Sequence, residues 1–364
     1  MEQKGCLDMR ENALDFFMGA IAPTGFCGYY AQFLRDAQAG NLSLLKAGPG
    51  CGKSTLLSRT ADALLKQGET VECIHCAGDP ASLDAIFCRA KHISMFDATA
   101  PHAAEPKYPV AVENVVSLYD ALDVGMLREN KAEIVALFEK NAALSERATR
   151  YITAAGSLLQ DTARTALCFT DTEKARSFAA ALGRRYLPMG KEGASEDVRL
   201  LSAVTCEGIC FFDKTIAQLA DTIVVLDDGF GAAGKVILNE LRMEALAKGH
   251  HIITCYCSLS PFEKIEHLFV PSLRLCFATS NAYHTVQFDG QRTIHCTRFC
   301  NKEGLALRQK RLKFNKKAVA KLLAQAQKML CEAKSCHDAL EVFYTQALDF
   351  KKVDAAWDAI ALTL

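Results

Sequence analysis

The sequence has no net charge and no long apolar stretch, and these two absences exclude several classes of protein. Its 42 Lys and Arg residues balance 42 Asp and Glu residues, so no overall field draws the chain onto nucleic acid or an anionic membrane. No run of about 18 apolar residues occurs, so no membrane-spanning helix is expected. The longest apolar run near the N-terminus, 16–22, is too short for a signal peptide and follows acidic residues. We expect a cytoplasmic protein with no membrane partner.

The sequence also lacks the second cysteine pair that a zinc ribbon requires. Sixteen cysteines are present, and Cys73 and Cys76 have the spacing of a metal-binding pair, but no second pair follows at a suitable distance. In a reducing compartment a free cysteine behaves as a small hydrophobic residue. We therefore interpret the cysteines as core residues rather than as disulfides or metal ligands.

The length and composition indicate a globular protein with more than one domain. The chain has 364 residues, of which 50% are hydrophobic and 23% are charged. At roughly 150 residues per domain, this length corresponds to two or three hydrophobic cores.

One segment has the pattern of a phosphate-binding loop between a strand and a helix. An apolar strand pattern at 42–46 leads into Ala-Gly-Pro-Gly-Cys-Gly-Lys-Ser at 47–54, and a helix pattern follows as far as Gly68. Glycines let successive N–H groups turn toward an anion, and the helix start adds unpaired N–H groups and a positive dipole end. A further strand at 70–76 completes the order of a P-loop. The residues expected to bind ATP are Gly48, Pro49, Gly50, Cys51, Gly52, Lys53, Ser54 and Thr55.

The side chains of this segment suggest how ATP and Mg²⁺ would bind. Lys53 is expected to reach the β- and γ-phosphates, the Ser54 hydroxyl to bind Mg²⁺, and Thr55 to lie near the α-phosphate. Hydrolysis also needs a carboxylate that positions the ion or a water, and Asp97, at the end of an apolar strand pattern, is the preferred candidate. Asp79, which ends the preceding strand, is the alternative. The expected catalytic residues are thus Lys53 and Asp97, and the expected Mg²⁺ ligands are Ser54 and Asp97.

The chain contains a weaker second copy of this pattern. The loop, the glycine that stops the following helix and a histidine further on all recur in the second half at a nearly constant offset. In the second copy Val236 replaces the hydroxyl of Ser54, and an apolar side chain cannot bind Mg²⁺. Thr279 or a neighbour takes the place of Asp97. We expect either a regulatory nucleotide site or a loop kept only as scaffold. The residues expected to form this degenerate phosphate loop are Gly229, Gly231, Gly234 and Lys235.

The repeat predicts an α/β fold with two tandem P-loop NTPase domains. Each domain would have a mostly parallel sheet flanked by helices and would carry a helical extension. The first domain is expected at 1–187, with its helical segment at about 112–182. The second is expected at 199–364, with its helical segment at about 305–360. The glycine- and serine-containing stretch 188–197 is the expected linker.

Three segments carry a family resemblance. They are 16–26, with Phe-Phe-Met-Gly and Thr-Gly-Phe, the loop at 47–54, and 97–109, with Asp-Ala-Thr-Ala-Pro-His and Glu-Pro-Lys-Tyr-Pro. On these segments nearly the whole chain resembles an uncharacterised bacterial family of tandem P-loop ATPases. The resemblance implies two P-loop modules, nucleotide binding, and ATPase or nucleotide-kinase-like chemistry with no defined substrate.

Three functions remain open from the sequence. The first is a Mg²⁺-dependent ATPase that acts in the N-terminal half, the second a nucleotide or small-molecule kinase, and the third a non-catalytic, nucleotide-responsive interaction module. Kinases of this fold usually place arginines over the phosphates, and no arginine occurs between Asp97 and Leu127. An unidentified protein partner stays open. The basic segment 308–317 also leaves nucleic acid open, although a solvated helix start is the favoured interpretation.

Overall fold

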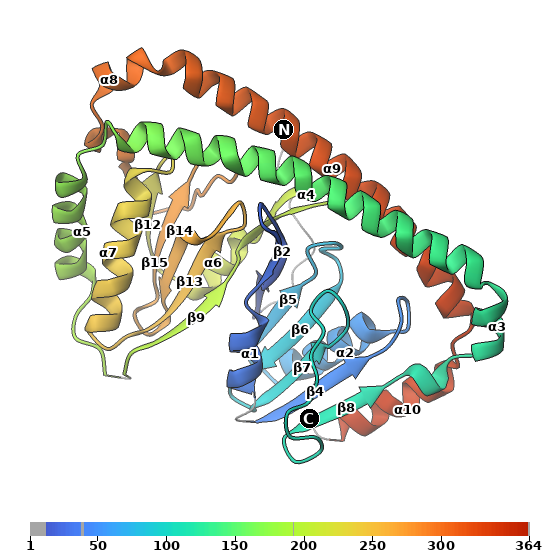
Figure 1. Ribbon diagram of the computed structural model, residues 1–364. Coiled ribbons are helices and arrows are strands. Elements are labelled where there is room, and N and C mark those ends of the chain that lie inside the picture. Colours follow the sequence, from blue (N-terminus) through green and yellow to red (C-terminus); the bar gives the residue numbers. More distant parts are fainter. Residues whose placement is uncertain (1–11, 38–39, 192, 363–364) are drawn as a thin grey trace.

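The computed structural model describes residues 12–37, 40–191 and 193–362, and places two α/β halves beneath a pair of long helices (Figure 1). The first half contains a six-stranded mixed sheet. Parallel pairing dominates, because only β6 runs antiparallel to its two neighbours. In sheet order the strands are β1 (Ala13–Phe17), β5 (Val71–His75), β6 (Leu83–Cys88), β7 (Ile93–Asp97), β4 (Asn41–Lys46) and β8 (Glu113–Ser117).

The second half repeats this sheet strand for strand. Its third strand is again the one that runs antiparallel to both neighbours. The first strand begins at Ala13 in one half and at Ser195 in the other, which matches the offset of the sequence repeat. The two sheets thus have the same topology, as a duplication predicts. In the same order the strands are β9 (Ser195–Arg199), β13 (His251–Cys257), β14 (Ser260–Val270), β15 (Leu275–Ser280), β12 (Thr222–Asp227) and β16 (Arg292–His295).

Each half surrounds its sheet with corresponding smaller elements. In the first half, α2 (Lys53–Lys66) buries Leu57, Ala61 and Leu64, which recur at helical spacing. It ends before Gly68, whose φ of +83° suits glycine. The other elements are β2 (Gly19–Ala22), β3 (Gly25–Gly28) and α1 (Tyr30–Ala37) in the first half, and β10 (Ser202–Thr205), β11 (Gly208–Phe211), α6 (Asp213–Leu219) and α7 (Ala233–Ala247) in the second.

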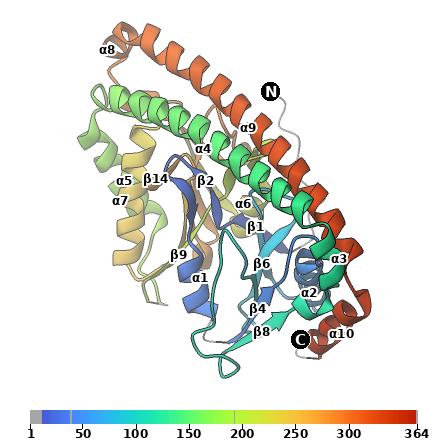
Figure 2. The ribbon, with the colours of Figure 1, turned by 45° about the vertical axis from the view of Figure 1, so that its right-hand side comes forward.

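The two longest helices are also counterparts and pack antiparallel to each other. They are α4 (Lys131–Leu167) and α9 (Gln309–Gln346), and they lie side by side over both sheets in both views (Figure 1, Figure 2). Asn141 near one end of α4 donates to Ala333 O, and Asn315 near the start of α9 reaches Leu158 O. None of the helices in the described ranges is both long and apolar enough to cross a membrane. The expected cytoplasmic location stays a prediction.

The helices that follow this pair are exchanged between the halves. Helix α5 (Thr172–Tyr186) comes from the first half but packs on α7 of the second, where Ala175, Ala179 and Leu182 join its core. Helix α10 (Phe350–Ala361) comes from the second half, and its Val353 and Ile360 lie in the core around α2. Short helices α3 (Val124–Glu129) and α8 (Lys302–Leu307) precede α4 and α9. Each core is therefore completed by the other half of the sequence.

A buried charge network joins the two sheets. Arg199 on β9 is 1% exposed, and its guanidinium lies 2.9 Å from the carboxylate of Glu72 on β5. Arg89 contacts the other oxygen of Glu72 and also pairs with Asp197. Burial raises the pKa of Glu72, but Arg199 and Arg89 outweigh it, so the net pKa is lowered. Removing one partner would leave a buried charge unpaired at a large cost in free energy. The network therefore holds the two halves together.

The structure differs from the sequence prediction at two boundaries. The linker expected at 188–197 runs into β9, which begins at Ser195 and buries Asp197 and Arg199. The second domain boundary expected at 199 therefore falls at the end of a strand. The helical segment expected from about 112 begins with β8 (Glu113–Ser117) and reaches α3 only at Val124. This edge strand exposes several of its side chains, so it lacks the apolar pattern that would have identified it.

Candidate functional site

The first glycine loop connects β4 to α2 at the carboxyl edge of the sheet. Strand β4 ends at Lys46 and α2 begins at Lys53, with Gly52 as its N-cap residue. Gly50 and Gly52 have φ values of +64° and +84°, a region that side chains with a Cβ disfavour. Strand, loop and helix are therefore arranged as the sequence predicts, with the start of the helix facing the loop.

The structure brings Lys53 and Asp97 together. Strand β7 lies beside β4 in parallel, so Asp97 at its end reaches the loop. Lys53 Nζ is 3.7 Å from Asp97 Oδ2 and donates to Ala47 O at 3.0 Å and Gly48 O at 2.8 Å. Thr99 donates to Asp97 Oδ1 through its amide and its hydroxyl. Burial raises the pKa of Asp97, while Lys53 acts in the opposite direction.

The other residues expected at this site have different surroundings. The Ser54 hydroxyl oxygen accepts a hydrogen bond from Leu83 N at 3.0 Å, and Thr55 is exposed. Asp79 accepts from Ser82 and lies 3.6 Å from Lys334 of α9. Asp97 rather than Asp79 is thus the carboxylate beside Lys53.

A histidine and a second carboxylate extend the site behind Asp97. His102 Nδ1 donates to Asp97 O at 2.7 Å, and its Nε2 lies 3.5 Å from Asp84 Oδ1 on β6. Tyr30 donates to the other oxygen of Asp84. Burial lowers the pKa of His102, but Asp84 outweighs it, so the net pKa is raised. Asp84 was not among the expected site residues, although the repeat aligns it with Glu266 of the second half.

Helix α9 of the second half packs directly on the first loop. A Cβ on Gly48 would lie 2.5 Å from the Tyr344 ring, and a Cβ on Gly50 would lie 2.9 Å from Glu341 Cβ. Thr345 also donates to Gly50 O at 3.3 Å. These glycines are therefore required by the packing of α9 as well as by the loop conformation. The sequence carries no local signal of this contact.

The corresponding loop of the second half is filled by its own aspartate. Strand β12 ends at Asp227 and α7 begins at Ala233, so one residue fewer separates strand and helix than in the first half. The carboxylate of Asp228 accepts from Gly231 N at 3.0 Å and from Gly234 N at 2.7 Å, with a longer contact to Phe230 N. These are N–H groups that a phosphate would need, so an anion can enter this cradle only if Asp228 leaves it.

Lys235 does not occupy the position of Lys53. Lys53 is the first residue of α2, whereas Lys235 is the third residue of α7. The side chain of Lys235 is 41% exposed, and its Nζ lies 4.0 Å from Glu263. The sequence repeat aligns the two lysines, but Lys235 lies further along its helix than Lys53 does, because α7 begins earlier relative to its loop than α2 does. The strand register does place Thr279 as expected, since it pairs with Leu226 as Asp97 pairs with Leu45.

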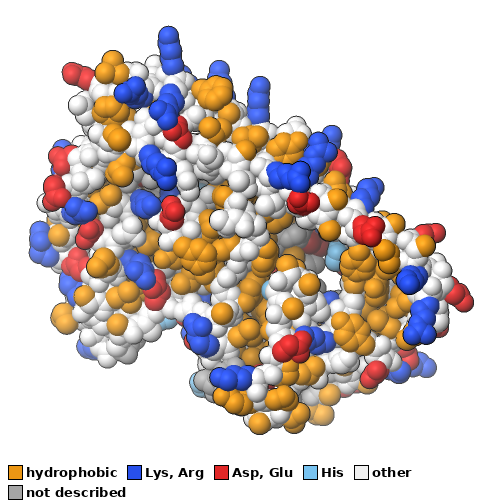
Figure 3. All heavy atoms as spheres, in the orientation of Figure 1, with side chains coloured by type: hydrophobic (Ala, Val, Ile, Leu, Met, Phe, Trp, Pro, Cys, Tyr) orange, Lys and Arg blue, Asp and Glu red, His pale blue; other side chains and the backbone are white. Residues whose placement is uncertain are grey.

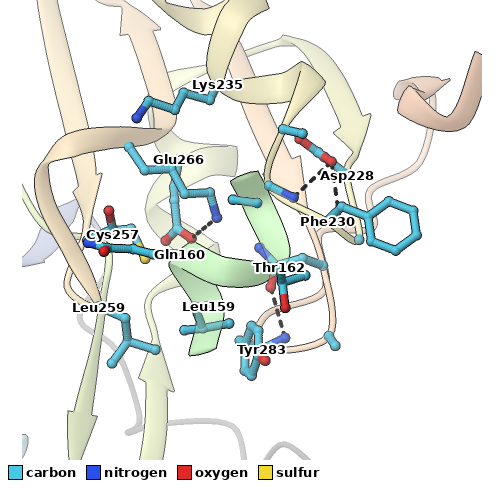
Figure 4. Close-up of a pocket in the computed structure, with 18 of the residues that line it drawn as sticks. Leu159, Gln160, Thr162, Asp228, Phe230, Lys235, Cys257, Leu259, Glu266 and Tyr283 are labelled. Atoms are coloured by element: carbon cyan, nitrogen blue, oxygen red, sulfur yellow. Dashed lines mark hydrogen bonds and ion pairs between the residues drawn. The ribbon is translucent and has the colours of Figure 1, made fainter. Parts of the chain in front are cut away.

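A cavity of about 640 Å³ lies next to the second loop (Figure 4). Its walls come from that loop, from β13 and β14, and from α4 and α9. Lys264 lines it and forms an ion pair with Glu266, with 3.0 Å between Nζ and Oε1. The volume falls within the range of small-molecule sites, roughly 300–1,000 Å³. The second half thus presents a cavity, although its phosphate cradle is filled.

The basic segment 308–317 begins at Arg308, between α8 and α9, and covers the start of α9. Arg311 forms an ion pair with Asp161 of α4, and Leu312 and Asn315 are buried. Figure 3 shows Lys and Arg side chains at the top of the molecule, where α8 and the start of α9 lie in Figure 1, interspersed with acidic and apolar ones. Part of the segment therefore serves the contact between α4 and α9.

Every cysteine in the described ranges is a free thiol, and most are buried.

Scans of protein-family models, of curated proteins and of solved structures found no match for this chain. The resemblance to tandem P-loop ATPases therefore stays a prediction.

Proposed function

We propose that the first loop binds a nucleoside triphosphate with Mg²⁺ and that the chain hydrolyses it there. The observation that carries this proposal is the meeting of Lys53 and Asp97, 3.7 Å apart, where two adjacent parallel strands end beside a helix start. This combination joins an anion-binding loop to a mobile cation and a carboxylate.

The backbone and Lys53 would bind the phosphates. The loop glycines and the start of α2 offer N–H groups, and Lys53 would exchange its bonds to Ala47 O and Gly48 O for phosphate oxygens. Each charge-assisted bond of this kind contributes about 1.5–3 kcal/mol.

The side chains fit a magnesium ion. A hydroxyl on Ser54 and a carboxylate on Asp97 are the hard oxygen donors that Mg²⁺ prefers. When bound, the ion supplies positive charge against the β- and γ-oxygens. Ser54 would contact it directly, and Asp97, held in orientation by Thr99, would act on it or on its waters.

The contact of α9 favours a second candidate, a nucleotide-responsive module. Tyr344 and Thr345 touch the loop that would surround the phosphates. A change in the loop would therefore act on α9, which reaches the second half. Hydrolysis and this coupling are compatible, whereas among the described residues no observation favours the kinase.

Binding and turnover by the full-length chain test the proposal. Lys53→Ala should weaken Mg²⁺-nucleotide binding by at least about tenfold, because one charge-assisted contact is lost. Lys66→Ala is the matched control, since Lys66 is exposed at the far end of the same helix. Equal affinity in both variants would reject the site. Tight binding by the wild-type chain without turnover would leave the nucleotide-responsive module.

A further inference from the structure

Three buried donors in the second half converge beside the cavity. Glu266 and His267 lie on β14, and His284 follows β15. One ligand atom from each lies within 4.8 Å of the others, and the three residues are at most 3% exposed. Two imidazoles and a carboxylate form a donor set that zinc sites use.

A β-bulge produces this convergence. Neighbouring residues of a regular strand point to opposite faces of the sheet. Here Tyr256 pairs with Ile265 and Cys255 with His267, so Glu266 is an extra residue on β14. Such a bulge re-aims a side chain, and these features are frequent next to functional sites.

His267 has donor atoms that the protein leaves unused. Neither of its ring nitrogens has a hydrogen-bond partner, although the side chain is 1% exposed. Buried polar atoms without a partner are rare and costly, which indicates a missing partner at this position.

His284 is held in the tautomer that a metal ligand requires. Its Nε2 lies 3.0 Å from Thr279 O and so carries the proton, while the contact to Asn281 Nδ2 is longer at 3.4 Å. Nδ1 then turns a lone pair toward Glu266 Oε2, 3.9 Å away. Two acceptors face each other here. Tetrahedral zinc with bonds of about 2.0–2.2 Å needs two donors roughly 3.3–3.6 Å apart, so a closure of a few tenths of an ångström would let one ion bridge them. The bond to a backbone carbonyl is the usual outer support of a ligating histidine.

The fold does not itself require this cluster. The corresponding residues of the first half, by the offset of the repeat, are Asp84, Ala85 and His102. There Asp84 and His102 pair with each other, and alanine replaces the third donor. The second histidine is thus a feature of the second half alone.

The cavity gives an ion access to the cluster. Glu266 and His284 line it, and so does Lys264, which pairs with Glu266. Lys264 binds Oε1 and leaves Oε2 directed toward His284. The positive charge of Lys264 repels a metal cation, so it should weaken the affinity for metal without blocking the donor atoms of Glu266 and His284.

We propose that Glu266, His267 and His284 bind one Zn²⁺-class divalent metal ion, with a remaining coordination position toward the cavity. This site is independent of the first loop, so its presence does not depend on nucleotide binding.

Zinc binding to the full-length chain, measured by competition with a chromophoric chelator, tests the proposal. The wild-type chain should bind one Zn²⁺, and His267→Phe should bind it at least about 100-fold more weakly, more than loss of an outer-shell partner costs. Lys264→Met should bind it at least about tenfold more tightly, because a neighbouring positive charge is removed. His295→Ala is the control and should bind normally, since His295 is exposed and pairs with Asp227 rather than with a residue of the cluster.

Thermal unfolding without metal separates a ligand from a structural histidine. A phenylalanine at 267 retains the ring contact with Phe211 and removes two unpaired nitrogens, so metal-free His267→Phe should be at least as stable as the wild type. Co²⁺ added to the wild type should give the absorption of a low-coordinate site, and His267→Phe should not. Equal zinc affinity in the wild type and His267→Phe, or no zinc bound by the wild type at micromolar free ion, would overturn the proposal.

Discussion

Asp228→Ala should open the second loop to phosphate. The carboxylate of Asp228 accepts from Gly231 N at 3.0 Å and Gly234 N at 2.7 Å, so it stands in for an anion in the cradle. Each of these charge-assisted bonds contributes about 1.5–3 kcal/mol, and cavity water can replace part of that. We therefore expect the free energy of unfolding to fall by about 2–3 kcal/mol.

The assay is chemical denaturation with and without pyrophosphate, in a Lys53→Ala background that removes the contribution of the first loop. In Asp228→Ala, pyrophosphate at about 100 times its dissociation constant should restore about 2.7 kcal/mol. Without the Asp228 substitution, pyrophosphate should have little effect. Asp227→Ala is the matched control, because Asp227 is half-exposed and pairs only at the surface with His295. Its unfolding free energy should change by less than about 1 kcal/mol.

Two results would refute this reasoning. Unchanged stability in Asp228→Ala would mean that the aspartate does not satisfy the loop. Equal stabilisation by pyrophosphate with Asp228 intact would mean that the cradle accepts anions despite the carboxylate.

Three further predictions concern the chemistry, the joint and the exchanged helices. Asp97→Asn should leave nucleotide binding within about threefold but lower turnover by at least about 100-fold, and normal turnover would exclude Asp97 from the reaction. Arg199→Met should lower the free energy of unfolding by about 3–5 kcal/mol at neutral pH, because Glu72 loses its buried partner. The arginines hold the pKa of Glu72 below its usual 4.5, so their stabilisation is present above pH 4.5 and is lost as pH falls through the lowered value. Denaturation at several pH values should therefore show the unfolding free energies of the wild type and Arg199→Met converging in acid. Isolated residues 1–187 should fail to unfold cooperatively by circular dichroism, since α10 is missing from their core, whereas a cooperative transition would show that the exchange is dispensable.

The first loop could be predicted because its signals are local. Glycines with positive φ, a lysine at the helix start and an apolar strand on either side are all contiguous in sequence. The strand expected at 70–76 is β5 (Val71–His75), and Asp97 ends β7 as expected. The repeat also predicted two sheets, because corresponding strands carry corresponding patterns.

The arrangement of the helices could not be predicted in the same way. An apolar stripe on α5 or α10 shows that the helix is buried but not which sheet it covers. The contact of Tyr344 with Gly48 joins the two ends of the sequence and has no local signature. The second loop was misaligned because its glycines match those of the first, although the helix begins one residue earlier after the strand. Glu266 and His267 were hidden because strand alternation predicts opposite faces, and only the bulge brings them together.

The most direct test of the central claim is the number of Mg²⁺-dependent nucleotides that each full-length chain binds and turns over. The hydroxyl of Ser54, which we propose binds Mg²⁺, has no counterpart at Val236, and Lys235 lies outside its loop. We predict one such nucleotide per chain, lost in Lys53→Ala and retained in Lys235→Ala. Two nucleotides per chain, or one that disappears in Lys235→Ala and survives in Lys53→Ala, would contradict the account.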